Sequence, residues 1–544
     1  MSLESLHRAK FKDDHSEEGI APSVILDPVD GAALTRDDAL SRGGESFDDV
    51  PSEKRTIGFY SAIFLIFNRI IGTGIFATPS SILQTAGSVG LAMFMWVIGA
   101  LIATAGLTVY IEYGTGLPRS GGELTYLSYL YTRPRYLAIA MYAAYAVSMP
   151  WPAGNATVFG EYILNAAGKD VTRWNQRGIA IACIAFAFIM HSRFLKCGLR
   201  LQNVLGVIKL GILLLIAISG FAALAGAIKL PEDQKPHNFH HAFEGTNSNA
   251  NAFVSGLYNV IWSFIGYSNV NYALSEVRNP VRTLKRAGPI AMASVTVVYI
   301  LVNVAYFAAV PKADILTSGR TVAALYFRNM FGHNAEKALS VFVALSALGN
   351  VLAVLFAQGR INQELGRIGV LPFSKFWASN KPFGAPAAGL ALQSFMCVVV
   401  ILGPPPGDVF NFILNLVSYP LAIINAFISG GLLFLYTPYS KRKGFDWAPP
   451  FRATWPVVLF FFLSNIFLSV APLIKPAPGM SPYKSLPYWL HVVVSLGVFG
   501  IGGVYWIFWA RVLPHYGKYS LERHHEIQED GVSRSVFKKV PKGE

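Results

Sequence analysis

Long apolar runs recur at close intervals between residues 57 and 509 of this chain. About 20 apolar residues suffice for a helix to cross the hydrocarbon core of a bilayer, where a helix satisfies its own backbone hydrogen bonds. Charged residues make up only 14% of the chain, against roughly 25% in soluble proteins. The sequence therefore predicts an all-α integral membrane protein with twelve spans, at residues 57–84, 89–114, 136–165, 178–191, 204–228, 251–274, 287–310, 339–360, 387–402, 409–436, 455–474 and 489–509.

The segments outside these spans set the predicted topology. Residues 1–55 hold 13 acidic and 7 basic residues, a composition typical of a disordered tail. We therefore expect an acidic tail at 1–55, a transporter-sized membrane domain at 56–510 and a polar tail at 511–544. An even number of spans places both tails on one side. The connectors on that side are rich in basic residues, such as Lys441, Arg442 and Lys443, so the positive-inside rule predicts cytosolic tails.

Several classes of function are excluded by the residues that the chain lacks. Its net charge of +14 is spread over short connectors rather than gathered with aromatic residues, which argues against nucleic-acid binding. The spans contain no HExxH motif, paired aspartates or Ser/His arrangement, so an enzyme is not expected. His237, His240 and His241 have near-metal spacing but no cysteine or ordered carboxylates beside them, so we expect a solvated loop. The sequence predicts neither a metal nor a cofactor.

The first span is interrupted near its middle by Gly72, Thr73 and Gly74. Such a break frees backbone N–H and C=O groups, which in a membrane must find partners or line a cavity. An exposed helix start would offer N–H donors and a positive dipole end to a carboxylate. The alternative is a close helix crossing through small residues.

A second interruption falls in the sixth span, where Gly266 and several polar residues lie between Trp262 and Tyr272. Interrupted helices at corresponding positions in two halves of a chain are typical of inverted-repeat transporters, whose sites lie at the bilayer midplane. The pair of interruptions therefore favours a transport site over a simple helix crossing.

Five motifs stand out along the membrane domain: Gly72-Thr-Gly-Ile-Phe76, Glu112-Tyr-Gly-Thr-Gly-Leu-Pro-Arg-Ser-Gly-Gly-Glu123, Ile208-Lys-Leu210, Ser275-Glu-Val-Arg-Asn-Pro-Val-Arg-Thr-Leu284 and Leu345-Ser-Ala-Leu-Gly-Asn350. Together they resemble the amino acid, polyamine and organocation (APC) transporter superfamily and, within it, the L-type amino acid transporter family. The runs 74–78 and 87–92 are most similar to those of fungal methionine permeases. The resemblance implies a LeuT-type fold with a 5+5 inverted repeat and discontinuous helices 1 and 6.

The resemblance also implies where a substrate binds. In the family, the substrate carboxylate meets backbone N–H groups at the first interruption and the ammonium meets carbonyls at the second. This division agrees with the charges that helix starts and helix ends prefer. The substrate-binding residues expected on this basis are Ile71, Gly72, Thr73, Gly74 and Ile75 in the first span and Trp262, Ser263, Phe264 and Ile265 in the sixth.

Two departures from the family pattern bear on the substrate. An aromatic residue at the position of Trp262 closes over the substrate in the family, and the mammalian relatives usually have phenylalanine there. Ile265 replaces a glycine that admits bulky substrates in several relatives. Trp262 leaves the size of the gate and the depth of the pocket open, whereas Ile265 should shrink the pocket and so favours a slender neutral amino acid, above all methionine. Cysteine, cystine or leucine as substrate, exchange instead of symport, and a non-transporting nutrient receptor are the alternatives.

Lys209 lies inside the fifth predicted span, and an ionisable residue at that depth is a functional candidate by default. Snorkelling to the interface is the alternative. In sodium-independent relatives a lysine at this position occupies the place of a sodium ion. A desolvated amine can also gain and lose a proton, so we expect proton coupling at Lys209 without a need for sodium.

Arg69 stands one turn before the first interruption and keeps its proton under all ordinary conditions. We expect it to pair with Glu112 or Glu276 and to latch an inner gate, although a purely structural ion pair is equally compatible with the sequence.

The loop at residues 168–177 bears on possible partners. Heavy-chain-dependent relatives use a cysteine in this loop, and the loop has none here. The expected partners are therefore an amino acid, a proton and the lipid bilayer, without an obligate disulfide-linked heavy chain. The expected location is the plasma membrane.

Overall fold

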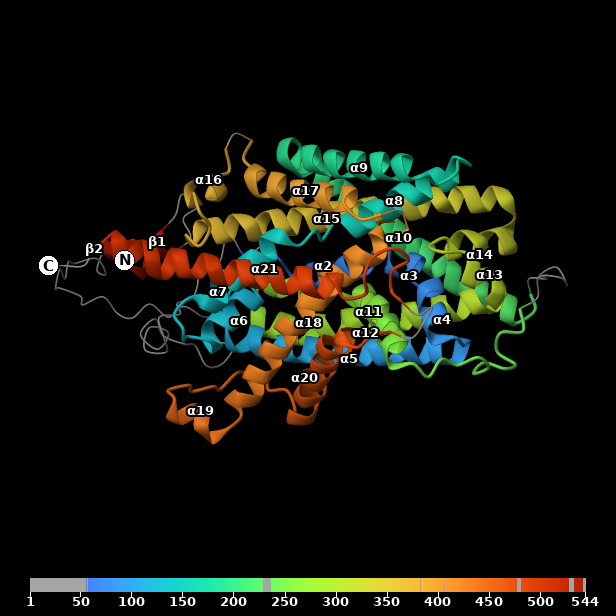
Figure 1. Ribbon diagram of the computed structural model, residues 1–544. Coiled ribbons are helices and arrows are strands. Elements are labelled where there is room, and N and C mark those ends of the chain that lie inside the picture. Colours follow the sequence, from blue (N-terminus) through green and yellow to red (C-terminus); the bar gives the residue numbers. More distant parts are fainter. Residues whose placement is uncertain are drawn as a thin grey trace, which may run out of the picture.

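The computed structural model describes residues 55, 57–227, 236–381, 383–405, 407–476, 481–527 and 533–541. The predicted N-terminal tail lies outside the described residues except for Arg55. Most of the described chain is helical, and the long helices run side by side along one axis (Figure 1). The prediction of an all-α membrane domain is confirmed at this level.

Eight helices among the described residues are long and apolar enough to cross a membrane. The α-helices α2 (Phe59–Ile70) and α3 (Gly74–Ala77) form the first, and α20 (Trp455–Val470) with η6 (Ala471–Leu473) forms the seventh. The eighth consists of α21 (Leu490–Ile507), η7 (Phe508–Val512) and α22 (Leu513–Tyr516). The other five are α5 (Val89–Gly116), α10 (Leu195–Leu224), α12 (Pro280–Ala309), α15 (His333–Arg367) and α18 (Val409–Leu435).

The four remaining predicted spans coincide with helices that are shorter, interrupted or less apolar. The third is divided into α7 (Leu137–Ser148) and α8 (Ala153–Ala166), because Pro150 and Pro152 each remove a backbone donor between them. The fourth predicted span coincides with α9 (Arg173–Arg193) and the ninth with the 16-residue α17 (Ala387–Leu402). The sixth coincides with α11 (Ala250–Phe264) followed by η5 (Asn269–Glu276). The count of twelve spans and the 5+5 repeat therefore stay predictions.

Short elements lie at the two ends of the helical body. One end carries α6 (Glu123–Leu130), α16 (Ser374–Ala378), α19 (Pro438–Arg442) and a hairpin of β1 (Tyr519–Ile527) and β2 (Ser533–Pro541) (Figure 1). We call it the basic end, because it holds the Lys- and Arg-rich connectors. The opposite end carries α4 (Pro79–Ala86), α13 (Lys312–Thr317) and α14 (Val322–Phe331).

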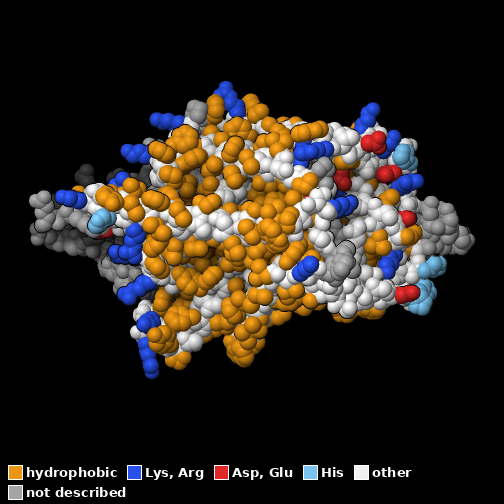
Figure 2. Space-filling model, in the orientation of Figure 1, with side chains coloured by type: hydrophobic (Ala, Val, Ile, Leu, Met, Phe, Trp, Pro, Cys, Tyr) orange, Lys and Arg blue, Asp and Glu red, His pale blue; other side chains and the backbone are white. Residues whose placement is uncertain are grey.

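The surface agrees with this division. In the face shown in Figure 2, apolar side chains cover the middle of the molecule, whereas acidic side chains gather mainly at the end opposite the basic end. Large apolar residues such as Ile218 (68% exposed), Phe395 (62%) and Ile501 (66%) point outward from long helices. Exposed side chains of this kind would be costly in water, so the middle band is suited to lipid.

The C-terminal hairpin packs against the basic end rather than standing alone. Phe537 lies between the rings of Tyr136 and Trp509, with centroid distances of 4.8 and 5.1 Å. Its backbone N–H donates to the carbonyl of Ile368 at 2.9 Å. The sequence analysis expected only a polar tail here, because the single apolar residue that anchors the hairpin gives no strand pattern.

A candidate substrate site at two broken helices

The first helix breaks where the glycines predicted it. The helix α2 ends at Ile70, Ile71 is extended with φ −72° and ψ 94°, and helix resumes at Gly74. The carbonyls of residues 68–70 and the N–H groups of Gly74 and Ile75 consequently have no partners within their own helices, whereas the N–H groups of Phe76 and Ala77 donate to the carbonyl of Thr73.

The second break follows α11. Ile265 leaves the helix with φ −59° and ψ 127°, and Gly266 has φ +129°, a conformation that side chains rarely adopt. A Cβ on Gly266 would also lie 2.6 Å from Cγ of Arg69, so the two broken segments touch here. The chain then continues as the 3-10 helix η5.

The two breaks lie side by side near the middle of the long axis, where Figure 1 shows α3 and α11. A Cβ on Gly74 would lie 2.8 Å from Cα of Ser263, so α3 and α11 also make the close crossing that was the alternative interpretation of the glycines. The hydroxyl of Tyr299 on α12 bridges the breaks, at 3.0 Å from the carbonyl oxygen of Ile70 and 3.1 Å from that of Ser263. The crossing and the freed backbone groups are therefore parts of one arrangement.

Lys209 on α10 holds the end of the first half-helix. Its Nζ donates to the carbonyls of Ile71 at 2.6 Å and Asn68 at 2.9 Å, and the residue is only 2% exposed. An ammonium group is favoured at the negative end of a helix dipole, which explains why a lysine lies here. The side chain does not snorkel to the surface in this structure.

A chain of amide groups faces the first break. The hydroxyl of Thr73 donates to Oδ1 of Asn155 at 2.7 Å, and Nδ2 of Asn155 donates to Oδ1 of Asn350 at 3.0 Å. Nδ2 of Asn350 also lies 3.4 Å from the carbonyl oxygen of Arg69. A Cβ on Gly72 would lie 2.6 Å from the same Nδ2. The sequence analysis did not assign these two asparagines a role, although each is a polar residue inside an apolar span.

A cavity of about 1020 Å³ leads from the basic end to the first break. Asn68 and Arg69 line its deep part, and Arg119, Glu276 and Arg360 line the part at the basic end. The volume is ample for an amino acid, since ligand pockets span roughly 300–1,000 Å³. The cavity therefore reaches the last turn before the first break from the basic end, but none of the expected substrate-binding residues 71–75 and 262–265 lines it.

The predicted pairing of Arg69 with an inner-gate carboxylate does not form in this conformation. Glu276 pairs with Arg360 at 3.2 Å. Glu112 accepts hydrogen bonds from Trp447 Nε1 at 2.8 Å, from the backbone of Ala453 at 2.7 Å and from the hydroxyl of Tyr436. Within the described residues, no ion pair joins Arg69 to either carboxylate. Glu112 instead anchors the connector after α18, a role that its position beside the second span did not reveal.

A further buried carboxylate lies beside the cavity. Glu123 at the start of α6 accepts hydrogen bonds from the phenols of Tyr110 and Tyr272, each at 2.8 Å, and of Tyr142 at 3.3 Å. Tyr142 and Tyr272 also line the cavity. The sequence analysis quoted Glu123 only as the end of a motif, because its tyrosine partners come from three different helices, α5, α7 and η5, which only packing brings together.

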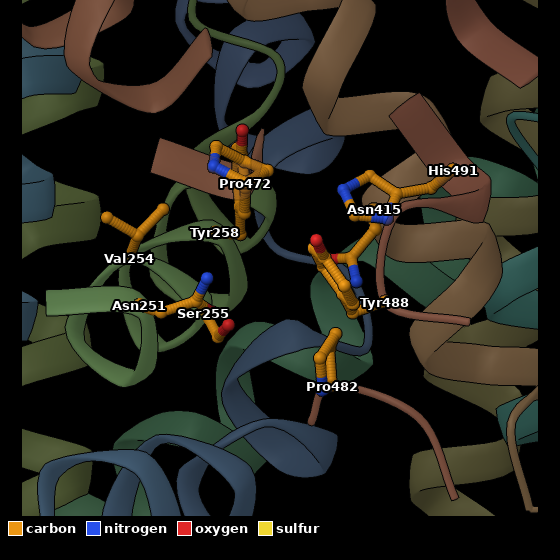
Figure 3. A pocket seen from close by; sticks show the side chains of 9 residues that line it. All are labelled: Asn251, Val254, Ser255, Tyr258, Asn415, Pro472, Pro482, Tyr488 and His491. Carbon is orange, nitrogen blue, oxygen red and sulfur yellow. The ribbon is translucent and has the colours of Figure 1, made fainter. Parts of the chain in front are cut away.

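A second, much smaller cavity lies between α11, α18 and the start of α21. Asn251, Tyr258, Asn415 and His491 are among the side chains around it (Figure 3). Its volume of about 10 Å³ is close to the minimum for one water molecule, far below that of an amino acid. The large cavity is therefore the better candidate for the substrate path.

Comparisons with known proteins agree with this geometry. The family described as amino acid permease matches residues 57–496. The chain is 48% identical over 523 residues to the high-affinity methionine permease of Saccharomyces cerevisiae, covering 95% of this chain and 90% of that protein. It is 30% identical over 526 residues to the low-affinity methionine permease of the same yeast, covering 95% of this chain and 92% of that protein. The b(0,+)-type amino acid transporter 1 of Mus musculus is 30% identical over 431 residues, covering 78% and 84%.

These matches extend over nearly the whole membrane domain and include both broken helices. The family resemblance seen in the sequence motifs is confirmed, and so is the expectation that the protein is not an enzyme. The chain belongs to the amino acid permease family and is a membrane transporter.

Proposed function

We propose that this permease imports methionine by proton symport and alternating access, with the substrate held between the two broken helices. The observation that carries the proposal is the contact between the two broken helices, beside a 1020 Å³ cavity that reaches Asn68 and Arg69 in the last turn before the first break. The names of the two yeast relatives supply the substrate.

The proposed contacts follow from the helix ends. The substrate carboxylate meets N–H groups of residues 72–75 at the start of α3, whereas the N–H of Ile71 already donates to the carbonyl of Phe67 at 2.9 Å. The ammonium meets carbonyls of residues 262–265. Two of these carbonyls already accept one bond each, from Ile265 N–H and from Tyr299, and each carbonyl oxygen keeps a second lone pair.

The pocket favours a slender side chain. Trp262 and Ile265 are both half-buried beside the second break, and the ring of Phe410 lies 5.6 Å from that of Trp262. These groups leave less room than smaller residues would. An unbranched, flexible thioether is adapted to such a space, whereas an indole is not. We infer that methionine is preferred over tryptophan.

Lys209 is the proposed proton-coupling residue. Its two hydrogen bonds to the end of α2 are strongest when the amine carries its charge. Protonation of Lys209 would therefore hold α2 against α10, and loss of the proton would loosen the half-helix. While it is protonated, Lys209 would also repel a sodium ion at this place.

The proposed topology has twelve spans in a 5+5 inverted repeat, with both tails in the cytosol and the protein in the plasma membrane. The basic end then faces the cytosol, in line with the positive-inside rule, and the large cavity makes this an inward-open conformation. We also propose that the chain works without a disulfide-linked partner, since residues 168–177 contain no cysteine.

The test is radiolabelled methionine uptake by the purified single chain in proteoliposomes with imposed pH or sodium gradients. We expect accumulation driven by an inward proton gradient, with no requirement for sodium or for a second protein. Leucine, cysteine, cystine and tryptophan serve as competitors. Stronger competition by leucine or cystine than by unlabelled methionine would overturn the substrate, and uptake only against preloaded amino acid would show an exchanger.

A further inference from the structure

An ion pair closes the side of the molecule opposite the inner cavity. Glu161 lies on α8, and Arg320 lies in the turn before α14. Nη1 of Arg320 is 2.5 Å from Oε2 of Glu161, and the two side chains are only 18% and 15% exposed. Gln176 on α9 also donates to Oε2 of Glu161 at 3.3 Å. The carboxylate is thus held from two sides.

Arg320 also contacts Phe410, the aromatic residue that packs against the expected gate, Trp262. Its guanidinium carbon lies 4.8 Å from the centre of the Phe410 ring on α18. The Phe410 ring packs edge to face against Trp262, with centroids 5.6 Å apart and an interplanar angle of 76°. A planar guanidinium can pair with a carboxylate and cover an aromatic face at once, which lysine cannot do.

The backbone around Arg320 is tied to the first broken helix as well. The hydroxyl of Tyr162 lies 2.7 Å from the carbonyl of Arg320 and 3.3 Å from that of Phe76 on α3. One tyrosine therefore links the turn that carries the arginine to the half-helix at the substrate site.

An ordinary surface ion pair would contribute little, because solvent and salt screen exposed charges. This pair differs in two respects. Its side chains are largely shielded from solvent, and its arginine also packs on the ring of Phe410, which in turn packs against Trp262. Opening a path to the substrate site from this end would require the contact between Arg320 and Phe410, or that between Phe410 and Trp262, to separate.

We propose that Glu161, Arg320 and Phe410 form an outer latch that holds Trp262 over the substrate site while the inner cavity is open. The three are positioning residues, since they act on the gate and not on the substrate. The inference deepens the proposed alternating-access function and rests on it for the assignment of inner and outer sides. Breaking the latch shifts the protein toward its outward-open state.

The experiment measures exposure of a thiol beneath the latch. Ile413 lies one turn after Phe410 on α18, is 1% exposed, and sits with Trp262 around Gly154. Ile413→Cys is introduced into a chain whose native cysteines are replaced by alanine, and a membrane-impermeant thiol reagent is added from outside. Labelling in the unaltered latch background gives the reference rate, which is proportional to the outward-open fraction when that fraction is small.

We expect Arg320→Gln and Glu161→Gln each to raise the labelling rate about fivefold or more, because an exposed ion pair reaches about 1 kcal/mol at most and this pair is shielded from solvent. Phe410→Leu should raise it similarly, because the intact ion pair no longer reaches Trp262. The charge-exchanged variant Glu161→Arg with Arg320→Glu should label more slowly than either single variant. Arg328→Gln, an exposed arginine on α14, is the matched control and should leave the rate unchanged.

An unchanged rate in Arg320→Gln, in protein that elutes as a single folded species, would overturn the latch. So would an unchanged rate in Phe410→Leu, because the pair would then be structural only. If Arg320→Gln does not fold, Glu161→Gln and Phe410→Leu decide the matter by the same readout. Methionine uptake by the unaltered chain is measured in parallel. No uptake there would refute the proposed function, while the labelling rates would still report on the latch.

Discussion

Replacing Lys209 by methionine removes the ammonium group and keeps the length of the side chain. In this conformation the carbonyls of Asn68 and Ile71 then lose donors at 2.9 and 2.6 Å. A buried acceptor left without a partner costs about 1–3 kcal/mol, so two such acceptors cost up to about 6 kcal/mol if α2 stays in place. The penalty falls on the end of the half-helix beside the inner cavity, so we expect the variant to leave this conformation more readily.

The effect on transport can be stated as an accumulation ratio. One proton moving down 100 mV supplies about 2.3 kcal/mol, enough for roughly fiftyfold accumulation of a neutral substrate carried with it. In proteoliposomes with a negative interior, the unaltered protein should approach that ratio, whereas Lys209→Met should only equilibrate methionine across the membrane. Lys209→Arg should also fail to accumulate it, because arginine keeps its proton.

Lys196→Met is the matched control, since Lys196 is exposed on the same helix α10. It should accumulate methionine as the unaltered protein does. Accumulation by Lys209→Met beyond about tenfold would refute the coupling role, because about 1.4 of the 2.3 kcal/mol, more than half of the proton's free energy, would then be used without this amine. Accumulation that needs a sodium gradient would refute it equally.

Three further changes test the site. Asn155→Ala leaves Thr73 and Asn350 without their 2.7 and 3.0 Å partner, so KM for methionine should rise at least about tenfold. Tyr299→Phe removes the hydroxyl that bridges the breaks and should lower the free energy of unfolding by about 1 kcal/mol, seen as a lower melting temperature in detergent. Gly266→Ala forces a side chain into φ +129° and against Arg69, so it should reduce the yield of folded protein, measured by gel filtration, far more than Gly497→Ala, where a Cβ meets nothing within 4 Å.

The breaks in the first and sixth spans could be predicted because glycine and polar residues stand out in an apolar run. Lys209 could be singled out for the same reason, since a charged side chain inside a span is costly and is seldom found there without a specific partner. These signals are local in the sequence. The helical, multi-span character of the domain follows equally from run length.

The partners of the site residues could not be predicted, since they are brought together only by packing. Asn155 and Asn350 are 195 positions apart, and Tyr299 is 229 positions from Ile70. Glu112 was predicted to face Arg69, yet it binds Trp447 and Ala453, more than 330 positions away. A single sequence gives the residue types suited to a buried polar contact but not which of them meet.

The freed backbone groups explain why these distant partners matter for transport. In a continuous helix the carbonyls accept hydrogen bonds from the helix itself, so the helix can move as a rigid rod without changing hydrogen-bond partners. At the break of α2 the carbonyl of Ile71 depends on Lys209, and that of Ile70 on Tyr299. Both donors belong to other helices, α10 and α12. In the proposed alternating-access cycle, a half-helix bound in this way would swing only by changing donors, so the hydrogen bonds that stabilise the broken helices would also define the discrete positions between which it moves.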